Sequence, residues 1–227
     1  MNFIMSVRQA FTTGLITFVS VMLLSACGSS GGGSDPLDSD VREFINSLSF
    51  SDASFQECVE MLARTNKWAS YSEVVELQCG NEINSMEGIG LFEELRKLDL
   101  GYSELASLDL SNNVKLTELN LTQVDLINID LSNNTKLTEL RLSSAWNLKS
   151  IDLSNNVELT KLGIFGAGFT SIDLSNNVEL TKLTLNSVDL TSIDLSNNEA
   201  LTELTLESSG LTSVDISNSA GLTYLFL

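Results

Sequence analysis

The sequence predicts an α/β solenoid: a right-handed stack of short coils with a parallel concave β-sheet and a small α-helical cap at its N-terminal end. Three observations predict this fold. The phrase Asp-Leu-Ser-Asn-Asn occurs five times at steps of 21 or 22 residues. A second phrase with alternating leucines lies between its copies, and a segment with helical apolar spacing precedes them. Self-similarity at such a period is typical of stacked repeats.

The alternating leucines explain why the coils should stack. Successive side chains of a strand point to opposite faces, so Leu119 and Leu121 face inward together. A single coil has no second layer to cover them, whereas neighbouring coils bury them at roughly 25 cal/mol per Å² of apolar area. We therefore expect a spine in which Leu119 lies over Leu140, followed by Leu162, Leu183 and Leu204.

The first coil indicates which half of the repeat forms the sheet. Its segment Val74–Cys79 matches the leucine phrase, but the next segment has an apolar residue at every third position from Ile83 to Phe92, as on a helical turn. Only the leucine phrase is strand-like in every coil, so it should form the concave sheet. The repeats then span 74–227 as seven full coils and a partial eighth, which begin at Val74, Leu95, Leu116, Leu137, Leu159, Leu180, Leu201 and Leu222.

This pattern resembles the bacterial leucine-rich repeats of the internalin type, particularly those with 21-residue repeats. The resemblance covers roughly Val74 to Leu227 and implies a leucine-rich-repeat stack. Some such proteins carry a cysteine at the last strand position of each coil. Here only the first coil has one, Cys79, and the others have Leu or Ile, so we expect no column of stacked cysteines.

The N-terminal segment resembles the signal peptide of a bacterial lipoprotein. Residues 10–24 form an apolar run of 15, the length of a signal-peptide core and too short to span a bilayer. Leu24-Ser25-Ala26-Cys27 resembles a lipobox, in which Cys27 receives the lipid. The alternative is an ordinary secretory signal with a chance cysteine.

A flexible tether is predicted to follow the signal peptide of residues 1–26. Residues 27–37 begin with the lipidated cysteine and are rich in Gly and Ser, which have little to pack. Gly28 stands where Asp would signal retention in the inner membrane, so the resemblance implies an outer-membrane lipoprotein of the cell envelope.

The charge balance makes nucleic acid an unlikely class of partner. Removal of residues 1–26 takes away Arg8 alone among the charged residues, which leaves 11 Lys and Arg against 30 Asp and Glu, a net charge of −19. Such a surface repels phosphate backbones and anionic lipids. It is compatible with a solubilising shell and with attraction to a basic partner or to divalent cations.

A helical cap is predicted over 38–73, because the open end of a solenoid exposes leucines. The apolar residues from Val41 to Leu48 have helical spacing and follow the N-cap candidates Ser39 and Asp40. This cap should cover the first coil.

A second cap helix is predicted from Ala53 to Thr65, with Ser54 and Glu57 as a capping box. In an exported protein, the remaining cysteines Cys58 and Cys79 are expected to form a disulfide between cap and first strand. The chain-entropy model gives such a bridge about 3 kcal/mol. Two buried free thiols are the alternative.

The aspartates that begin each Asp-Leu-Ser-Asn-Asn phrase should form a column on the convex side. Such a column could bind calcium, or each carboxylate could accept hydrogen bonds at its own turn. The second interpretation is favoured, because the Gly-rich repeat of calcium-binding solenoids is missing, so no metal site or cofactor is predicted. The weak metal candidates are Asp109, Asp130, Asp152, Asp173, Asp194 and Asp215. The last asparagine of each phrase should cap backbone groups at the corner: Asn113, Asn134, Asn156, Asn177 and Asn198.

Two charges in each coil change sign together. Lys115 and Glu118 in one coil become Glu158 and Lys161 in another. This pattern predicts exposed ion pairs within single coils, each stabilising the fold by about 0.2–1 kcal/mol.

Outward positions of the predicted sheet differ from coil to coil, whereas the convex phrase hardly changes. Such variation is compatible with a recognition face and also with neutral drift. Trp146 lies in the only 22-residue coil, where a bulge could display or bury its ring. The final strand offers an uncovered edge that could bind a second copy of the chain. The candidate binding face comprises Lys97, Tyr102, Glu118, Asn120, Arg141, Trp146, Lys161, Phe165, Lys182, Glu203, Tyr224 and Phe226.

Catalysis is poorly supported, so we do not expect an enzyme. The chain has no histidine, which removes the commonest general base. Its acids recur with the repeat rather than as an isolated pair. The sequence therefore predicts a cell-envelope lipoprotein that presents its repeats to a protein partner, by resemblance in adhesion or host interaction. The alternative is a structural or calcium-dependent envelope component.

Overall fold

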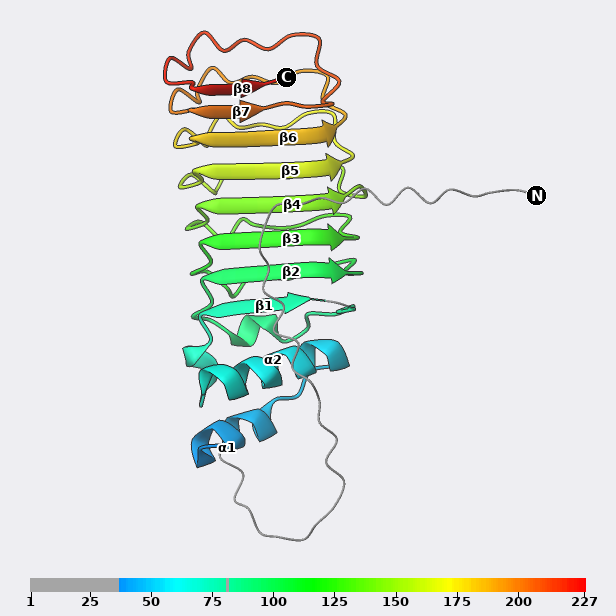
Figure 1. The fold of residues 1–227 in the computed structure, drawn as a ribbon, viewed down its shortest axis with the longest axis vertical. Coiled ribbons are helices and arrows are strands. Elements are labelled where there is room, and N and C mark those ends of the chain that lie inside the picture. The colour runs from blue at the N-terminus through cyan, green and yellow to red at the C-terminus, as the bar shows by residue number, and fades with distance from the viewer. Residues whose placement is uncertain (1–36, 81) are drawn as a thin grey trace, which may run out of the picture. The chain divides into compact units, whose positions relative to one another are not determined.

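One parallel sheet organises the protein (Figure 1). The computed structural model describes residues 37–80 and 82–227. Residues 37–227 belong to one compact unit. The predicted signal peptide and nearly all of the tether, with Cys27, lie outside the described residues. In the described part, no helix is both long and apolar enough to cross a membrane.

The sheet has eight strands in sequence order, each parallel to the next. The registers place Leu119 beside Leu140, then Leu162, Leu183 and Leu204, which confirms the predicted spine. The strands are β1 (Glu76–Gly80), β2 (Lys97–Ser103), β3 (Glu118–Val124), β4 (Glu139–Ala145), β5 (Lys161–Ala167), β6 (Lys182–Val188), β7 (Glu203–Thr205) and β8 (Tyr224–Phe226).

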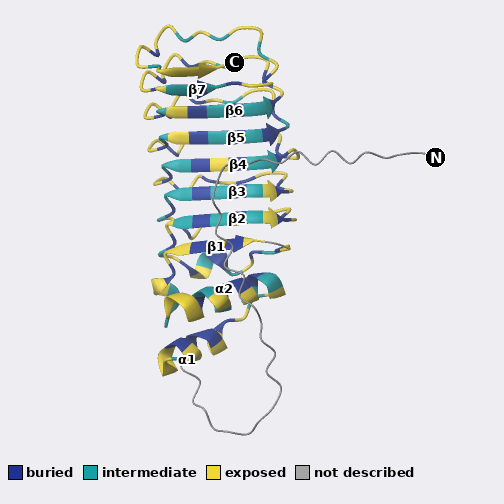
Figure 2. Cartoon of the chain, in the orientation of Figure 1, coloured by how far each residue is buried: buried dark blue, intermediate teal, exposed yellow. Residues whose placement is uncertain are grey.

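Leucines from both phrases form the core between the sheet and the convex segments. Figure 2 shows the buried positions recurring from strand to strand. Leu119 and Leu140 are each 1% exposed, and so are Leu131 and Leu153 of the convex phrase. Each coil is one layer of this core, as expected if apolar burial depends on the neighbouring coil.

A column of buried asparagines joins the convex corners. The Nδ2 group of Asn156 donates to Leu131 O at 3.1 Å and to Asn134 O at 2.9 Å, both in the preceding coil. Asn113, Asn134, Asn177 and Asn198 make the equivalent pair of bonds. The prediction that these residues cap backbone groups is confirmed, and the capped groups belong to the previous coil.

A second column lies where each strand begins. The Oγ1 hydroxyl of Thr138 donates to Thr117 O at 3.0 Å, and the backbone N–H of Thr138 donates to the same oxygen at 2.8 Å. Thr160, Thr181, Thr202 and Thr223 do the same to the coil before them. The threonine of the Leu-Thr phrase thus reinforces the sheet at its amino-terminal edge.

One residue near the end of most strands adopts the left-handed conformation. Gln123 has φ 54° and Gly166 has φ 67°. The spacing of buried residues therefore changes there from two to three, as between Leu121 and Val124. Two successive side chains then point outward. The other members of this set are Tyr102, Ser144, Ser187 and Ser208.

Two helices lie at the β1 end of the stack. α1 (Ser39–Ser47) is capped by Asp38, whose carboxylate accepts from Asp40 N, so the predicted N-caps Ser39 and Asp40 are wrong by one or two positions. α2 (Ala53–Asn66) is close to its predicted bounds, but Asp52 caps it and not a Ser54–Glu57 box. Two 3₁₀ turns, Tyr71–Glu73 and Ile89–Leu91, flank β1 in sequence.

Asp52 also ties the cap to the first coil. Its Oδ1 accepts from Phe55 N at 2.9 Å, while Oδ2 accepts from Asn84 N at 2.8 Å and Ser85 N at 3.2 Å. Partial burial opposes ionisation, but these backbone donors outweigh it and lower the pKa of Asp52. A carboxylate serves both the helix and the coil here, which the hydroxyl of Ser54 could not do.

The disulfide between Cys58 and Cys79 is present, with the two Cα atoms 5.9 Å apart. It joins α2 to β1 across a sequence separation of 21. Together with Asp52, it fixes the helical cap on the first layer of the core.

We expect replacement of a buried corner asparagine to destabilise the protein. Asn156→Ala removes two buried hydrogen bonds, to Leu131 O and Asn134 O, at a cost of about 1 to 3 kcal/mol in the free energy of unfolding. Chemical denaturation measures this change. Asn155→Ala is the control, because its exposed side chain makes no hydrogen bond within the described residues. Equal effects of both substitutions would contradict the role assigned to the column.

Candidate binding surface

The candidate residues share the outward face of the sheet. Lys97, Glu118, Lys161, Lys182, Glu203 and Tyr224 form one column at the first strand position. Asn120 and Arg141 are register partners two residues further along, in the column that ends with Phe226. Phe165 and Tyr102 lie nearer the carboxyl ends of their strands, and Trp146 lies in the turn that follows β4. The structure therefore brings these residues onto one surface, which we call the sheet face.

Ion pairs of the sheet face join neighbouring coils, so the predicted pairing within single coils is wrong. The Nζ–carboxylate distances are 3.1 Å for Lys97–Glu118, 3.0 Å for Lys161–Glu139 and 2.6 Å for Lys182–Glu203. Lys115 of the convex corner likewise pairs with Glu94 of the previous coil. The strands are about 4.8 Å apart, which suits a Lys–Glu contact between adjacent coils.

The ion pairs shift the pKa values of their side chains but contribute little to the free energy of unfolding. Hydrogen bonds from the Lys97 and Lys161 ammonium groups to their glutamates, and the charges of those glutamates, raise the pKa of both lysines. The hydrogen bond from Lys115 lowers the pKa of Glu94. All these side chains are solvent-exposed, so we regard the pairs as neutralising the sheet face.

Arg141 and Phe165 form a stacked pair on this face. The guanidinium carbon lies 4.4 Å from the ring centroid, within the range of a cation–π contact. A hollow of about 360 Å³ surrounds them and is lined also by Glu139, Lys161 and Lys182. A smaller hollow of about 130 Å³ continues across β2 and β3 and shares Arg141 in its lining.

Trp146 is displayed rather than buried, with 59% of its surface exposed. It occupies the turn that follows β4 in the 22-residue coil. A Cβ atom on Gly166 would lie 2.6 Å from the indole Cζ2, so the ring rests directly on the glycine backbone of the next strand. The indole thus crosses from β4 onto β5.

The aspartate column lies on the convex side and serves its own turns. The Oδ1 of each aspartate accepts from the backbone N–H of the serine two residues later at 2.9 Å, from Asp109 to Asp215. The favoured structural interpretation of these residues is supported. Among residues 37–80 and 82–227, no group of three acidic or cysteine side chains forms a metal-binding cluster.

The serine at each turn lowers the pKa of its aspartate. For Asp109, Asp130 and Asp152 the serine hydroxyl is the main cause, and for Asp173, Asp194 and Asp215 the backbone N–H is. The charge of a neighbouring aspartate opposes this effect at several positions.

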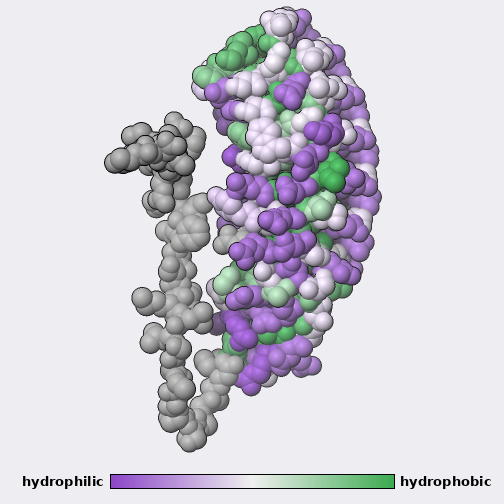
Figure 3. Space-filling model, turned by 90° about the vertical axis from the view of Figure 1, so that its right-hand side faces the viewer, coloured by the Kyte–Doolittle hydropathy of each residue, from purple (hydrophilic) through white to green (hydrophobic). Residues whose placement is uncertain are grey.

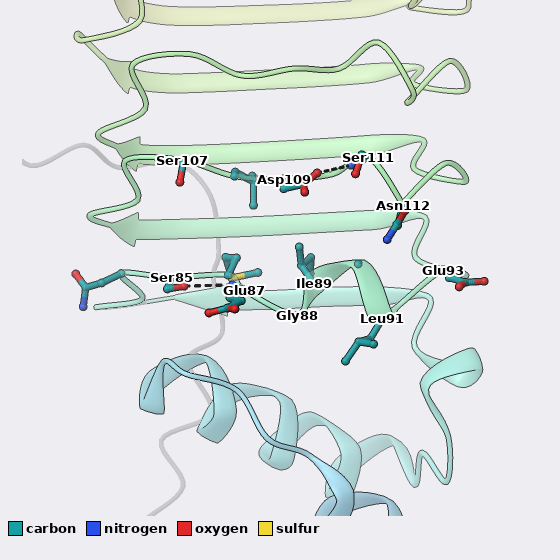
Figure 4. Close-up of a pocket in the computed structure, with 14 residues that line it drawn as sticks. Ser85, Glu87, Gly88, Ile89, Leu91, Glu93, Ser107, Asp109, Ser111 and Asn112 are labelled. Carbon is teal, nitrogen blue, oxygen red and sulfur yellow. Dashed lines mark hydrogen bonds between the residues drawn. The ribbon is translucent and has the colours of Figure 1, made fainter.

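A larger hollow of about 570 Å³ lies where the first two coils differ on the convex side (Figure 4). The 3₁₀ turn Ile89–Leu91 forms one wall, and Ser107 to Asn112 form the other. Two hydrogen bonds of its polar groups close local turns, from Glu87 N to Ser85 Oγ and from Ser111 N to Asp109 Oδ1. Others join the lining to the cap, from Asn84 N and Ser85 N to Asp52 and from Ser51 Oγ to Glu87. The hollow therefore forms where the 3₁₀ turn of the first coil meets the different convex segment of the second coil. It was not predicted from the sequence.

Side chains at the carboxyl ends of the strands are mostly hydrophilic, with small apolar areas between them (Figure 3). A larger apolar area occurs at the C-terminal end of the stack. Tyr224, Leu225, Phe226 and Leu227 are 42% to 66% exposed there. Within the described residues, β8 pairs with β7 alone.

No protein-family model matches the chain, and no curated protein is significantly similar to it. Several solved structures are similar in fold. The functional domain of InlJ from Listeria monocytogenes is 24% identical with a TM-score of 0.51, over 69% of this chain and 40% of that one. A leucine-rich-repeat protein from Leptospira interrogans is 21% identical with a TM-score of 0.57, over 65% of this chain and 41% of that one.

The fold is a leucine-rich-repeat solenoid. Its structural neighbours are internalin and leucine-rich-repeat proteins, and it spans less than half the length of either structure above. The InlJ structure is described as including a cysteine ladder. In the leucine-rich repeats of this chain, Cys79 is followed in its column by Leu100, Leu121, Leu142, Ile164 and Leu185, so the absence predicted for that column is observed.

Sequence reasoning missed three features of the sheet face. The left-handed residue near the strand end has a sequence signal, because the spacing of apolar residues changes there from two to three. The glycines of β5 also had a signal, since the other coils carry larger residues at their positions. Lys149, which donates to Trp146 O at 3.4 Å, had none.

We expect acid to destabilise the leucine-rich repeats. The column aspartates have folded pKa values below the ordinary 3.8, so their contribution to stability is present above about pH 4 and is lost as the pH falls through the folded values. Denaturant midpoints measured from about pH 6 to pH 3 should fall with acidification. Asp152→Asn should reduce this fall, since Asn does not titrate, whereas Asp125→Asn outside the column should leave it unchanged. A fall that is identical in all three proteins would contradict the assignment.

Proposed function

We propose that this chain is a cell-envelope lipoprotein whose sheet face binds a protein partner. The observation that carries the proposal is the contrast between the two sides of each coil. Convex positions repeat because each makes the same bond in every coil: Asn156 donates to the preceding coil, and Asp152 accepts from the serine N–H of its own turn. Sheet-face positions are joined to neighbouring coils by exposed ion pairs such as Lys161–Glu139, which contribute little stability, and they carry a different set of side chains in every coil.

The composition of the sheet face supports protein binding. Tyr, Trp and Arg are enriched at the energetically dominant positions of protein interfaces. Tyr102 is 65% exposed, Trp146 59% and Tyr224 54%, and Arg141 is exposed on the same face. The parallel ladder holds these side chains on a rigid backbone, so little conformational entropy is lost when a partner binds.

The anchor rests on the sequence. Leu24-Ser25-Ala26-Cys27 supports lipidation at Cys27, and the Gly/Ser segment after it would let the repeats stand away from the membrane. Adhesion and host interaction are narrower forms of the same proposal, and the fold likeness to internalin proteins motivates them.

The sheet face can be tested with two matched triple variants that leave the charge unchanged. Replacing Tyr102, Trp146 and Tyr224 by Ser removes exposed aromatic side chains from the sheet face. Replacing Val114, Val157 and Val178 by Ser removes 46–48% exposed apolar side chains from the convex turns. Each full-length protein is cross-linked in envelopes and on candidate host surfaces, and its partners are quantified.

We expect the sheet-face variant to recover its partner at least tenfold less well, since removal of one energetically dominant interface aromatic costs about 2 kcal/mol or more and a tenfold loss of affinity corresponds to about 1.4 kcal/mol. The convex variant should behave as the unaltered protein. The proposal fails if the convex variant loses the partner, or if neither variant changes the recovery.

The anchor has a separate test. We expect Cys27→Ala to move the protein from the membrane fraction to the soluble fraction, because a single acylated cysteine with several chains is a firm anchor. Cell fractionation and metabolic labelling with a fatty acid measure the change, and Cys79→Ala is the control that removes a cysteine elsewhere. Membrane retention of Cys27→Ala would contradict lipidation at this position.

A further inference from the structure

Beyond the first coil, the repeat departs from its own pattern in two adjacent coils. The coil that contains β4 has the inserted residue and Trp146, and β5 in the next coil has Gly163 and Gly166 where the other coils carry larger side chains. Strand β3, for example, has Asn120 and Gln123 at these positions. A departure confined to one place in a regular stack marks a local requirement, because the coil contacts are satisfied by the ordinary pattern.

The two glycines provide room for two aromatic rings. A Cβ atom on Gly163 would lie 3.2 Å from Phe165 Cε2, and one on Gly166 would lie 2.6 Å from Trp146 Cζ2. Gly166 also has φ 67°, which a glycine adopts without strain. The Phe165 ring therefore lies against Gly163 and the indole lies over Gly166, and Trp146 keeps 59% of its surface exposed.

Arg141 is held in place but has no charged partner. Its guanidinium stacks on Phe165, and no carboxylate lies within ion-pair distance of it among residues 37–80 and 82–227. The two lysines of the same hollow are already neutralised by Glu139 and Glu203. The lining of this hollow therefore has three cations and two acids, and Arg141 is the cation without an acidic partner; with the smaller hollow included, Lys97, Asp99 and Glu118 bring the count to four cations and four acids.

We propose that Arg141, Phe165 and Trp146 form a subsite for an extended acidic peptide segment of the protein partner. The Arg141 guanidinium would bind a Glu or Asp carboxylate through two parallel N–H···O bonds, and Trp146 would hold the neighbouring apolar side chain. This inference rests on the proposed function and names the chemistry that the sheet face recognises.

The shape of the sheet face favours a peptide over an acidic sugar chain. Arg141 lines both hollows, which together cross β2 to β7. Six strands at about 4.8 Å spacing give a track of roughly 24 Å, the length of about seven extended residues. A sugar would need free aromatic faces for stacking, but Arg141 covers one face of Phe165. Of the two subsite aromatics, Trp146 then has the larger exposed surface, and the exposed Tyr102 and Tyr224 lie away from it on β2 and β8.

The two tryptophans of the chain allow a site-specific test. Trp68 is 8% exposed in the cap and serves as the internal reference for Trp146. The full chain is titrated in detergent with a seven-residue peptide of alternating Glu and Leu, with its Gln–Leu counterpart and with an oligogalacturonate, while NMR follows both indole N–H signals. We expect the Glu–Leu peptide to shift the Trp146 signal saturably and the Trp68 signal not at all.

Two variants with the same charge change locate the carboxylate contact. Arg141→Gln should weaken binding of the Glu–Leu peptide by about tenfold or more, as the loss of a charge-assisted contact implies. Arg96→Gln, at an exposed position ahead of β2, should leave it nearly unchanged. Gly166→Ala should also weaken binding because its Cβ displaces the indole, whereas Gly101→Ala, which has open space around it, should not.

Several results would overturn the subsite. These are equal binding of the Glu–Leu and Gln–Leu peptides, an equal effect of Arg141→Gln and Arg96→Gln, or a shift of Trp146 by the oligogalacturonate alone, which would assign the site to an acidic glycan. If the sheet-face aromatics still govern capture of the partner in those cases, the proposed function stands and only the subsite fails.

Discussion

Each coil of this protein is completed by the coil before it. The buried asparagine at the corner uses both amide hydrogens on the preceding coil, as Asn177 does with Leu153 O and Asn156 O. The threonine at the strand start does the same on the opposite side of the core. The asparagine amide and the threonine hydroxyl and N–H thus obtain their acceptors only in the stack, whereas the carbonyls at the corner also accept from a backbone N–H of their own turn. The amide donors carry this role, so Asp could not replace Asn there.

This dependence makes the first coil the exceptional one. It has no earlier coil to complete it, so other groups must supply the missing contacts. Asp52 accepts from Asn84 and Ser85 where a repeat would use a neighbouring turn, and the Cys58–Cys79 bridge covers β1 with a helix. The aromatic rings of Phe55, Phe92 and Tyr71 fill the space between cap and first layer. The helical cap therefore covers the first coil as a preceding coil would, but through a carboxylate, a disulfide and aromatic rings.

The sequence predicted the features that recur in every coil, but it did not predict the side-chain contacts between particular coils. The leucine spine, the coil starts and the corner asparagines follow from a period that is visible in the letters, because each acts at the same place in every coil. Ion pairs such as Lys161–Glu139 depend on which coils are adjacent in space, so a pattern within one coil gave the wrong partner. The stack of Arg141 on Phe165 depends on ring orientation, which periodicity does not encode. Capping by Asp52 depends on a contact with a segment more than 30 residues away.

The same division explains why recognition belongs on the sheet face. A substitution at a corner position breaks a contact with the preceding coil, so those positions are held to one residue type by stability. A substitution on the outward side of a strand leaves the leucine core and the backbone ladder intact and removes at most an exposed ion pair or hydrogen bond. It therefore costs little stability and acts mainly through contact with a partner. Strand β5 is unusual in this respect, because it has Gly163 and Gly166 at positions where the adjacent strands have larger residues. Removing a side chain weakens a strand, so the gain must come from the rings that occupy the space. Within the folded chain, however, Trp146 buries less than half of its surface against these glycines and their surroundings. A large ring that stays this exposed is expected at a surface that binds a partner.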